Sequence, residues 1–421
     1  MIKLLIIADD FTGGLDTGVQ FASRGIRTRV VTDPQVDFRT AADSAQVLVV
    51  VAETRHMPPD QAYAAVFQAV QKGVEAGIPS IYKKTDSGLR GNIGAELSAV
   101  MDAAGEKRMY FMPAMPALAR LTVNGVHYID SVPVAESVFG RDPFEPVRES
   151  NVLRLIGLQT RTPAYSATAD TLPAARDGIW VVDARTDADL AAAGRSLARC
   201  GALRITAGCA GFASVLPDLL NLEADRPPVC PPLDDGLLVL CGSVNPITQR
   251  QLRFAGEHGF TRLHITPEQK LRPGYFSSPE GRAVLAGWQR QSEAQPWLIL
   301  DANDEDDANT ATAAYAAERH MDTETLRSAI SSALGDILPA MLQGPKRTLL
   351  ITGGDTLLQC MNRMHVFQME PLLEIFPGVV LAQFESGGQT RFAMTKSGGF
   401  GQESLLVDIK SRIEAQSQPA Q

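Results

Sequence analysis

Several features that would place this 421-residue chain in a familiar class are missing from its sequence. It contains no GxxxxGK[ST] loop, and no GxGxxG fingerprint follows an early strand, so the two commonest nucleotide-binding motifs are absent. Its longest apolar runs, such as residues 47–52, are far shorter than the roughly 20 residues of a membrane-spanning helix. Any nucleotide site in this chain must therefore be built in another way.

Cysteine and positive charge are also scarce. The five cysteines show no CxxC pair and no metal-type spacing with the six histidines, so we expect reduced thiols and no metal site. With 39 basic and 48 acidic residues the net charge is −9, so neither nucleic acid nor a membrane surface is expected as a partner. The chain starts without a signal-peptide pattern. We expect a cytoplasmic protein, and these features leave a homodimer open.

The length and the pattern of apolar segments predict two α/β domains. A chain of 421 residues is too long for one ordinary core. Short apolar runs alternate with helical patterns, which indicates a mostly parallel sheet flanked by helices in each domain. Four prolines fall within residues 227–232 and suit an interdomain connector. We predict an N-terminal domain at 1–222, a linker at 223–235 and a C-terminal domain at 236–421.

Two polar stretches are predicted to lack regular structure. Residues 113–144 are rich in Pro, Gly and polar side chains, which favours a long excursion from the sheet. Residues 301–307 are mostly acidic and follow an apolar strand, which favours a solvated surface loop.

The opening stretch is the first candidate site. Residues 4–8 form an apolar run without alternation, which is typical of a strand buried on both faces. Asp9 and Asp10 follow it directly, at the strand end where open α/β sheets bind ligands. Gly13 and Gly14 then allow close approach of the backbone. Alternatively, one aspartate caps the next helix, which would account for only one of the two carboxylates.

Side chains of both charges follow the later strands of the N-terminal half. Arginine suits a carboxylate or phosphate, whereas a carboxylate suits sugar hydroxyls and is able to take a proton from one of them. The mixture would fit a small polyhydroxylated acid, and surface ion pairing is the alternative. His127 is either a base or a structural residue. The charged residues are Asp9, Asp10, Arg55, Lys83, Lys84, Asp86 and Arg90.

The C-terminal half contains three glycine turns, each after a predicted strand. Two of them open a helix, where free backbone N–H groups favour an anion, so we predict a nucleotide-phosphate site. Lys396 either meets a phosphate or is simply an exposed lysine at a strand end. The turns are Gly242-Ser243, Gly353-Gly354-Asp355-Thr356 and Gly398-Gly399-Phe400-Gly401.

Four stretches together resemble the four-carbon acid sugar kinase family, the ATP-dependent kinases of threonate, erythronate and 3-oxo-tetronate. The resemblance runs along nearly the whole chain. It implies a sugar-acid-binding N-terminal domain, an ATP-binding C-terminal domain, and phosphoryl transfer with Mg²⁺ in the cleft between them. The stretches are Ala8-Asp9-Asp10-Phe11-Thr12-Gly13, Lys84-Thr85-Asp86-Ser87-Gly88-Leu89-Arg90-Gly91-Asn92, Gly353-Gly354-Asp355-Thr356 and Lys396-Ser397-Gly398-Gly399-Phe400-Gly401.

The resemblance also assigns roles to residues. It implies that Asp10, Asp86 and Arg90 are catalytic, with Asp10 or Asp86 deprotonating or orienting the acceptor hydroxyl. One departure is Ala119, where such kinases usually have Gly before Arg. The stretch 16–20 is more like threonate-type members, so D-threonate is the expected substrate. Substrate-binding residues would be Asp9, Asp10, Arg55, Lys83, Lys84, Thr85, Asp86 and Arg90, and ATP-binding residues Ser243, Gly353, Gly354, Asp355, Thr356, Lys396, Gly398 and Gly399.

Three other functions are compatible with parts of the sequence. A ribokinase-like kinase of a neutral sugar would use the Gly353-Gly354-Asp355 turn with Asp355 as base. A metal-dependent phosphatase would use two aspartates separated by one residue, which the adjacent Asp9 and Asp10 do not match. A sugar-acid sensor would bind the ligand without turnover.

Overall fold

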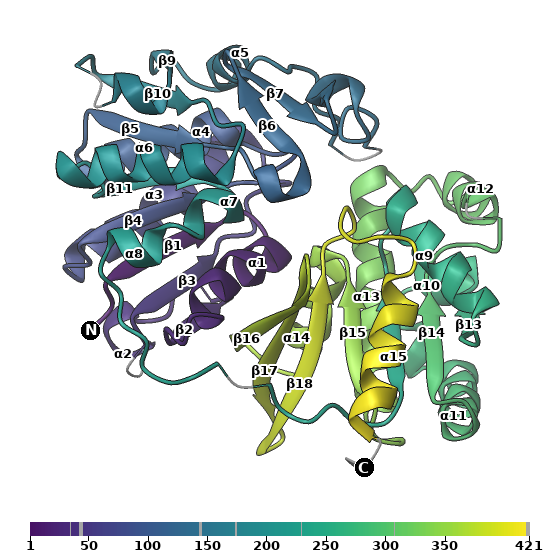
Figure 1. Cartoon of the computed structure of the whole chain (residues 1–421). Helices are drawn as coiled ribbons and strands as arrows, with labels where there is room; N and C mark the ends of the chain where they lie inside the picture. Colours follow the sequence, from purple (N-terminus) through teal and green to yellow (C-terminus); the bar gives the residue numbers. More distant parts are fainter. Residues whose placement is uncertain are drawn as a thin grey trace. The chain divides into compact units, whose positions relative to one another are not determined.

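The computed structural model describes residues 1–33, 35–41, 45–142, 145–172, 175–228, 230–306 and 308–417. The chain divides into two compact units, Met1–Pro228 and Val229–Gln421 (Figure 1). Each contains a mostly or wholly parallel sheet flanked by helices, which confirms the predicted fold class. Within the described residues, no helix combines the length and apolar character that crossing a membrane requires.

The first unit is built on a sheet whose described strands all pair in parallel, in the order β2-β3-β1-β4-β11-β5-β10-β9. Strand β1 lies between β3 and β4 and is buried along its whole length, which explains its unbroken apolar run. The strands are β1 Leu4–Ala8, β2 Thr28–Val31, β3 Val47–Val51, β4 Ser80–Lys84, β5 Arg108–Met112, β9 Ala164–Ala167, β10 Gly178–Val182 and β11 Ile205–Gly208.

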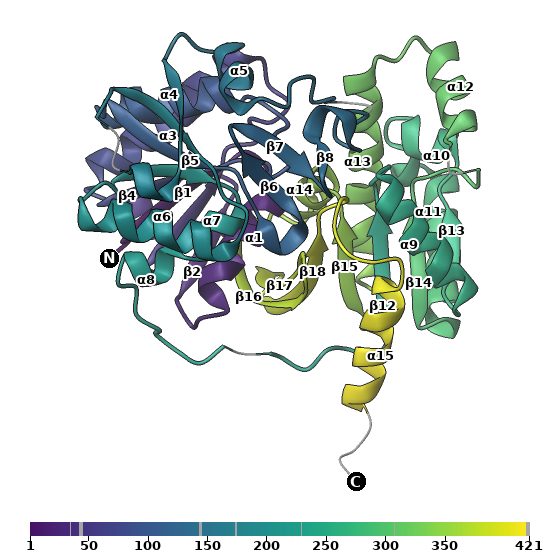
Figure 2. The same cartoon turned by 45° about the horizontal axis from the view of Figure 1, so that its top comes forward.

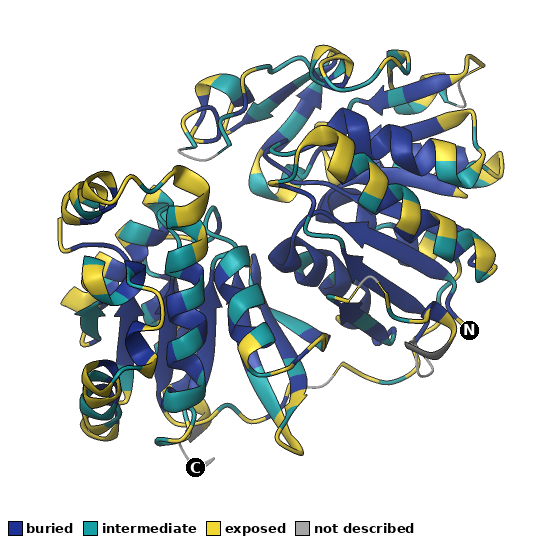
Figure 3. Ribbon diagram, turned by 180° about the vertical axis from the view of Figure 1, so that it is seen from behind, coloured by how far each residue is buried: buried dark blue, intermediate teal, exposed yellow. Residues whose placement is uncertain are grey.

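Helices cover both faces of this sheet, so its central strands are shielded from water (Figures 1 and 3). One group packs together as α1 Phe11–Ala22, α6 Asp187–Arg199, α7 Ala210–Ala213 and α8 Leu216–Leu219. The other group is α3 Pro59–Glu75, α4 Ile93–Ala104 and α5 Val152–Gly157. The unit also contains two short helical segments, α2 Phe38–Ala41 and η3 Ala169–Thr171.

The prediction of an irregular excursion at 113–144 is wrong for the described part of that segment. It forms a small antiparallel sheet, seen well in Figure 2. The signal was the Asn124-Gly125 pair, whose φ angles of 51° and 71° make the tight turn between two strands. The elements are η1 Pro116–Leu118, β6 Arg120–Val123, β7 Val126–Ile129, β8 Val132–Pro133 and η2 Val134–Glu136.

The second unit has strand order β13-β14-β12-β15-β18-β17-β16. The first five strands pair in parallel, and β18, β17 and β16 pair in antiparallel fashion. The strands are β12 Leu237–Cys241, β13 Thr261–His264, β14 Trp297–Asp301, β15 Thr348–Thr352, β16 Gln368–Phe376, β17 Val379–Ser386 and β18 Gln389–Lys396.

The helices of the second unit also form two groups. Helix α9 starts as the sequence predicts, with Asn245 as cap and Pro246 in the first position. It packs with α15, and the two are α9 Pro246–Glu257 and α15 Leu405–Ser417. The others are α10 Pro267–Leu271, η4 Tyr275–Ser277, α11 Pro279–Ala294, α12 Thr310–Glu318, α13 Thr323–Met341 and α14 Gly354–Arg363.

The expectation of a solvated acidic loop at 301–307 is wrong for residues 301–304, which are buried, whereas Glu305 and Asp306 are exposed as expected. Asp301 is fully buried and bound by the Arg262 guanidinium at 2.6 Å. Asp304 is paired with the Lys270 ammonium at 2.7 Å. These carboxylates point inward because they pair with a half-buried arginine of β13 and a buried lysine of α10, which no local pattern reveals.

Candidate functional site

The first candidate site lies at the carboxyl end of β1. Asp10 caps α1 by accepting a hydrogen bond from the Gly13 N–H at 3.1 Å, and Thr12 Oγ1 donates to its other oxygen at 2.8 Å. A Cβ atom on Gly13 would lie 2.3 Å from both Asp10 Oδ1 and Lys84 Nζ, so a larger residue would displace these two charged groups. The capping interpretation of Asp10 is therefore correct, and the next contact shows that it is incomplete.

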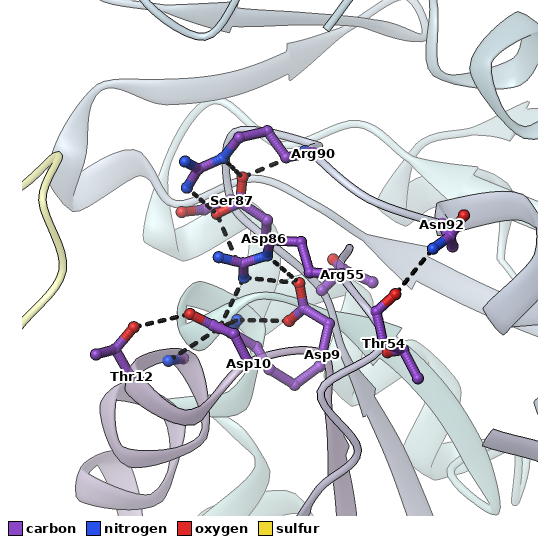
Figure 4. A network of polar contacts seen from close by, with 12 residues as sticks. Asp9, Asp10, Thr12, Thr54, Arg55, Asp86, Ser87, Arg90 and Asn92 are labelled. Atoms are coloured by element: carbon purple, nitrogen blue, oxygen red, sulfur yellow. Dashed lines mark hydrogen bonds and ion pairs between the residues drawn. The ribbon is translucent and has the colours of Figure 1, made fainter. Parts of the chain in front are cut away.

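The Arg55 guanidinium joins the two aspartates (Figure 4). Its Nε donates to Asp9 Oδ2 at 2.7 Å and its Nη2 to Asp10 Oδ1 at 2.7 Å. The same Nη2 lies 3.9 Å from Asp86 Oδ1. Arg55 follows β3, Asp9 follows β1 and Asp86 follows β4, and these three strands are neighbours. Their carboxyl ends therefore bring the charges together at one edge of the sheet.

Asp86 and Arg90 form the second half of this cluster. Arg90 Nε and Nη2 donate to the two oxygens of Asp86 at 2.7 and 3.1 Å, and the Arg90 backbone N–H donates at 3.2 Å. Arg90 Nη1 also reaches Asp142 at 3.1 Å. Between them Leu89 is buried and has φ of 62°, a left-handed conformation that a leucine rarely adopts. Its buried side chain anchors the turn that presents the Asp86–Arg90 pair.

Neighbouring charges keep the acidic groups ionised. Burial alone would raise the pKa of Asp9, but Arg55 and Lys84 outweigh it and lower this pKa to about 2. Burial likewise opposes the charge of Asp86, but Arg90 and Arg55 hold its pKa well below the usual range. Lys84 Nζ lies 3.4 Å from Asp9 Oδ1. We call Asp9, Asp10, Arg55, Lys84, Asp86 and Arg90 the carboxylate–arginine cluster.

Two residues predicted to bind substrate lie outside this cluster. Lys83 is fully buried, its ammonium 3.0 Å from Glu96 Oε2, and Thr85 is fully buried against β11, donating to the Gly208 carbonyl at 3.4 Å. Side chains alternate between the faces of a strand, so Lys83 and Thr85 face away from Lys84 and Asp86. We do not carry Lys83 and Thr85 into the proposed site.

Glu96 is a buried partner that the sequence analysis missed. It lies on the buried face of α4, pairs with Lys83 and accepts a hydrogen bond from the Thr54 hydroxyl. Asn92 Nδ2 donates to the Thr54 carbonyl at 2.8 Å. These contacts fix the residue directly before Arg55. The one available signal was a glutamate within an otherwise small and apolar helix start.

His127 has a structural role. Its ring is fully buried, with Nδ1 3.0 Å from Thr122 Oγ1 and Nε2 3.0 Å from the Ser87 carbonyl. Burial lowers its pKa to about 4, so it is neutral near pH 7. Of the two interpretations left open by the sequence, the geometry supports the structural one.

The departure at Ala119 has a conformational consequence. Ala119 ends η1 with φ of 52°, in the left-handed region where glycine is preferred. Arg120 follows it, and its buried guanidinium donates to the Ser87 hydroxyl. The backbone path that a Gly-Arg pair would take is thus retained with alanine, at some cost in strain.

The second candidate site lies at the carboxyl ends of β12, β15 and β18, which are neighbours in the second sheet. A Cβ on Gly398 would lie 2.4 Å from Ser243 Oγ, and one on Gly242 would lie 2.1 Å from Thr356 Oγ1. Gly353 has φ of 107° and precedes α14 directly. The three glycine turns therefore meet beside the N-termini of α9 and α14, and we call them the glycine-turn site.

The remaining residues predicted at ATP surround this site in different ways. Gly354 and Asp355 are the first residues of α14, and Asp355 Oδ2 pairs with Arg327 Nη1 at 2.9 Å. Gly399 belongs to the turn after β18. Sequence reasoning missed Asn303, whose Nδ2 donates to the Ser243 carbonyl at 3.1 Å and so holds the turn after β12.

A pocket of about 490 Å³ lies elsewhere in the second unit, between α10, η4 and α13. Its walls include Tyr275, Phe276 and Ser328. None of the residues predicted to bind ATP is among those that line it.

The fold and the two sites define a protein with two α/β units, one carrying buried paired charges and the other glycine turns. Family comparisons agree with this division. Residues 4–216 match the family model of a sugar-binding N-terminal domain, and residues 238–406 match that of a nucleotide-binding C-terminal domain.

Individual relatives extend along the whole chain. D-threonate kinase of Salmonella typhimurium is 30% identical, covering 98% of this chain and 99% of that protein. 3-Oxo-tetronate kinase of Pseudomonas fluorescens is 27% identical, covering 94% and 93%. A crystal structure from Salmonella typhimurium LT2, 22% identical, covers 98% of this chain and 100% of that one with a TM-score of 0.77, which shows the same fold. The chain belongs to the four-carbon acid sugar kinase family.

Proposed function

We propose that this protein transfers the γ-phosphoryl group of ATP to a hydroxyl of a four-carbon sugar acid. D-threonate is the first candidate substrate, and D-erythronate and 3-oxo-tetronate follow. The main support is the carboxylate–arginine cluster at the strand ends of the unit that matches a sugar-binding domain. The relatives named as kinases of threonate and 3-oxo-tetronate support the same substrate class.

The cluster suits recognition and positioning of a polyhydroxylated acid. Arg90 has 18% of its side chain exposed, against 9% for Arg55 and 4% for Lys84, so it is the cation that a substrate carboxylate reaches most readily. The side-chain oxygens of Asp10 and Asp86 would accept hydrogen bonds from substrate hydroxyls. Because the low pKa of Asp86 makes it a weak base, its main contribution would be to orient the attacking hydroxyl. Phosphoryl transfer tolerates this, since its loose transition state depends chiefly on positioning and charge neutralisation.

The glycine-turn site would hold the ATP phosphates. Glycines packed against Ser243 and Thr356 would let phosphate oxygens approach the backbone closely, and two helix N-termini would add favourable dipoles. Mg²⁺ usually binds phosphate oxygens and water plus one or two carboxylates, and would neutralise charge on the phosphates. Asp355, at the start of α14 and paired with Arg327, would be the carboxylate for that role.

A coupled ADP-release assay tests this function. Mg-ATP would be offered with D- and L-threonate, D- and L-erythronate, 3-oxo-tetronates, and neutral tetroses and pentoses. We expect turnover with one or two acids, lost in Asp10→Asn and Arg90→Ala and retained in Arg24→Ala, which changes only an exposed ion pair. Turnover with neutral sugars that survives Arg90→Ala would favour the ribokinase-like alternative. No ADP release with any compound would favour the sensor. A cytoplasmic location and a homodimer stay predictions.

A further inference from the structure

Lys396 is a buried lysine whose hydrogen-bond partners are all uncharged. It ends β18 with 1% of its surface exposed. Its Nζ lies 3.0 Å from Thr248 Oγ1, 3.1 Å from the Ser397 carbonyl and 3.4 Å from the Gly398 carbonyl. Among the described residues, no carboxylate forms an ion pair with it. An ammonium has three N–H donors for these three acceptors, whereas a neutral amine has two.

The groups packed around Lys396 supply no negative charge. On β12 the Cys241 thiol is buried, which raises its pKa well above the usual range and keeps it protonated. Thr352 of β15 and Val379 of β17 are in register with Lys396, and the Thr248 hydroxyl of α9 contacts its ammonium. Because burial without a counter-charge disfavours the ammonium, the pKa of Lys396 falls to about 7.

Two carboxylates at the same edge of the sheet are already paired with arginines. Asp301, the last residue of β14, is held by Arg262 at 2.6 Å, and Asp355 of α14 is held by Arg327 at 2.9 Å. These carboxylates therefore do not serve as counter-charges for the Lys396 ammonium. A bound anion would supply the counter-charge.

Lys396 also determines the shape of the glycine-turn site. It is bound to the carbonyls of the turn that follows it, and Thr248 Oγ1 donates to the Gly398 carbonyl at 2.9 Å. Gly398 in turn packs against Ser243. The ammonium thus contacts the backbone of the turn, and it would affect a ligand bound there by holding that backbone in place.

We propose that Lys396 is a positioning residue that couples nucleotide binding to the uptake of one proton. The inference rests on the proposed function, because the anion is taken to be the nucleotide phosphates. When the phosphates bind, a proton from the buffer adds to the Nζ lone pair. The resulting ammonium satisfies its three acceptors and stabilises both the turn and the anion. No other bond forms or breaks in the chain.

Isothermal titration of the full chain with Mg-ADP tests the coupling. Measurements at about pH 8 in Tris and in HEPES, whose ionisation enthalpies differ, give the protons taken up per nucleotide. At that pH the ADP phosphates are already deprotonated. We expect an uptake of more than about half a proton, and an affinity that falls by up to tenfold per pH unit above about pH 8.

Three variants assign the proton. Lys396→Met should abolish the uptake and weaken binding, whereas Lys396→Arg, which stays charged, should abolish the uptake alone. Lys346→Met changes an exposed lysine and should behave as wild type.

Binding of Mg-ADP to wild type without proton uptake would overturn the inference, and so would uptake that persists in both Lys396 variants. No binding of Mg-ADP to wild type, checked by equilibrium dialysis, would instead overturn the proposed nucleotide site itself. If Lys396→Met does not fold, the wild-type measurement and Lys396→Arg still test whether Lys396 takes up the proton.

Discussion

Arg55 Nε lies 2.7 Å from Asp9 Oδ2, although 46 residues separate them along the chain. Both groups are buried, and the same guanidinium reaches Asp10. A single arginine therefore compensates adjacent carboxylates that would otherwise repel each other. The charges of this site are interdependent, and the predictions below follow from that.

Replacing Arg55 by alanine should lower both stability and activity. It leaves Asp9 and Asp10 buried without their main partner, which costs about 3 kcal/mol or more of unfolding free energy. Urea denaturation measures this loss. Arg24→Ala, which removes an ion pair with side chains 42% and 78% exposed, should cost less than about 1 kcal/mol. Equal losses in the two variants would contradict a central role for Arg55.

Gly13→Ala should impair activity by displacing two charged groups. The added Cβ would lie 2.3 Å from Asp10 Oδ1 and from Lys84 Nζ, so both buried side chains would have to move. We expect kcat/KM to fall by at least about tenfold, equivalent to about 1.4 kcal/mol. Gly256→Ala is the matched control because nothing lies within 4 Å of its Cβ, and it should stabilise α9 by about 0.5–1 kcal/mol. Unchanged kinetics in Gly13→Ala would show that the cluster tolerates displacement.

His127 should make stability depend on pH. Its folded pKa of about 4 lies below the ordinary 6.5, so between these values the unfolded chain binds a proton that the folded chain does not. The stabilisation is complete above about pH 6.5 and declines by about 3 kcal/mol as the pH falls to 4. Below about pH 4, protonation of Asp9 continues the decline, because its pKa is lowered to about 2.

Urea denaturation of wild type and His127→Gln across that range measures the His127 contribution. The variant should lose less stability between pH 6.5 and 4 than wild type does, whatever its stability at neutral pH. Parallel pH profiles would exclude His127 as the titrating group.

The buried Lys83–Glu96 pair should show strong coupling. Lys83→Met leaves Glu96 buried without a cation and should cost about 3–5 kcal/mol of unfolding free energy. Glu96→Gln should cost less. The double variant should cost clearly less than the sum of the two single ones, because neither charge is then left alone. Additive losses in denaturation experiments would mean that the two groups act independently.

Ala119→Gly should stabilise the protein slightly. Ala119 has φ of 52°, and glycine relieves that strain while adding entropy to the unfolded chain, for a net gain of up to about 1 kcal/mol. Thermal or urea unfolding measures the gain. A loss of stability would show that the alanine methyl group makes a compensating contact.

The sequence was informative about the strands and the residues at their ends. Unbroken apolar runs predicted the buried parallel strands, and the residue types after them predicted that Asp9, Asp10, Arg55, Asp86 and Arg90 share a site. It was misleading where a polar residue was expected to face a ligand, as with Lys83 and Thr85, or solvent, as with Asp301. Lys83, Thr85 and Asp301 are polar and fully buried, because each finds its partner on another element.

Local patterns in the chain thus determined the α/β class, the helix starts at Asp10 and Asn245, and the glycine turns, because these depend on neighbours within a few residues. Only the tertiary structure decided which charges are paired. The contacts of Arg55 with Asp9, of Glu96 with Lys83 and of Lys396 with Thr248 join residues that are distant in sequence. Strand order and the alternation of side chains between sheet faces decide those contacts, and no single segment of the sequence is enough to predict them.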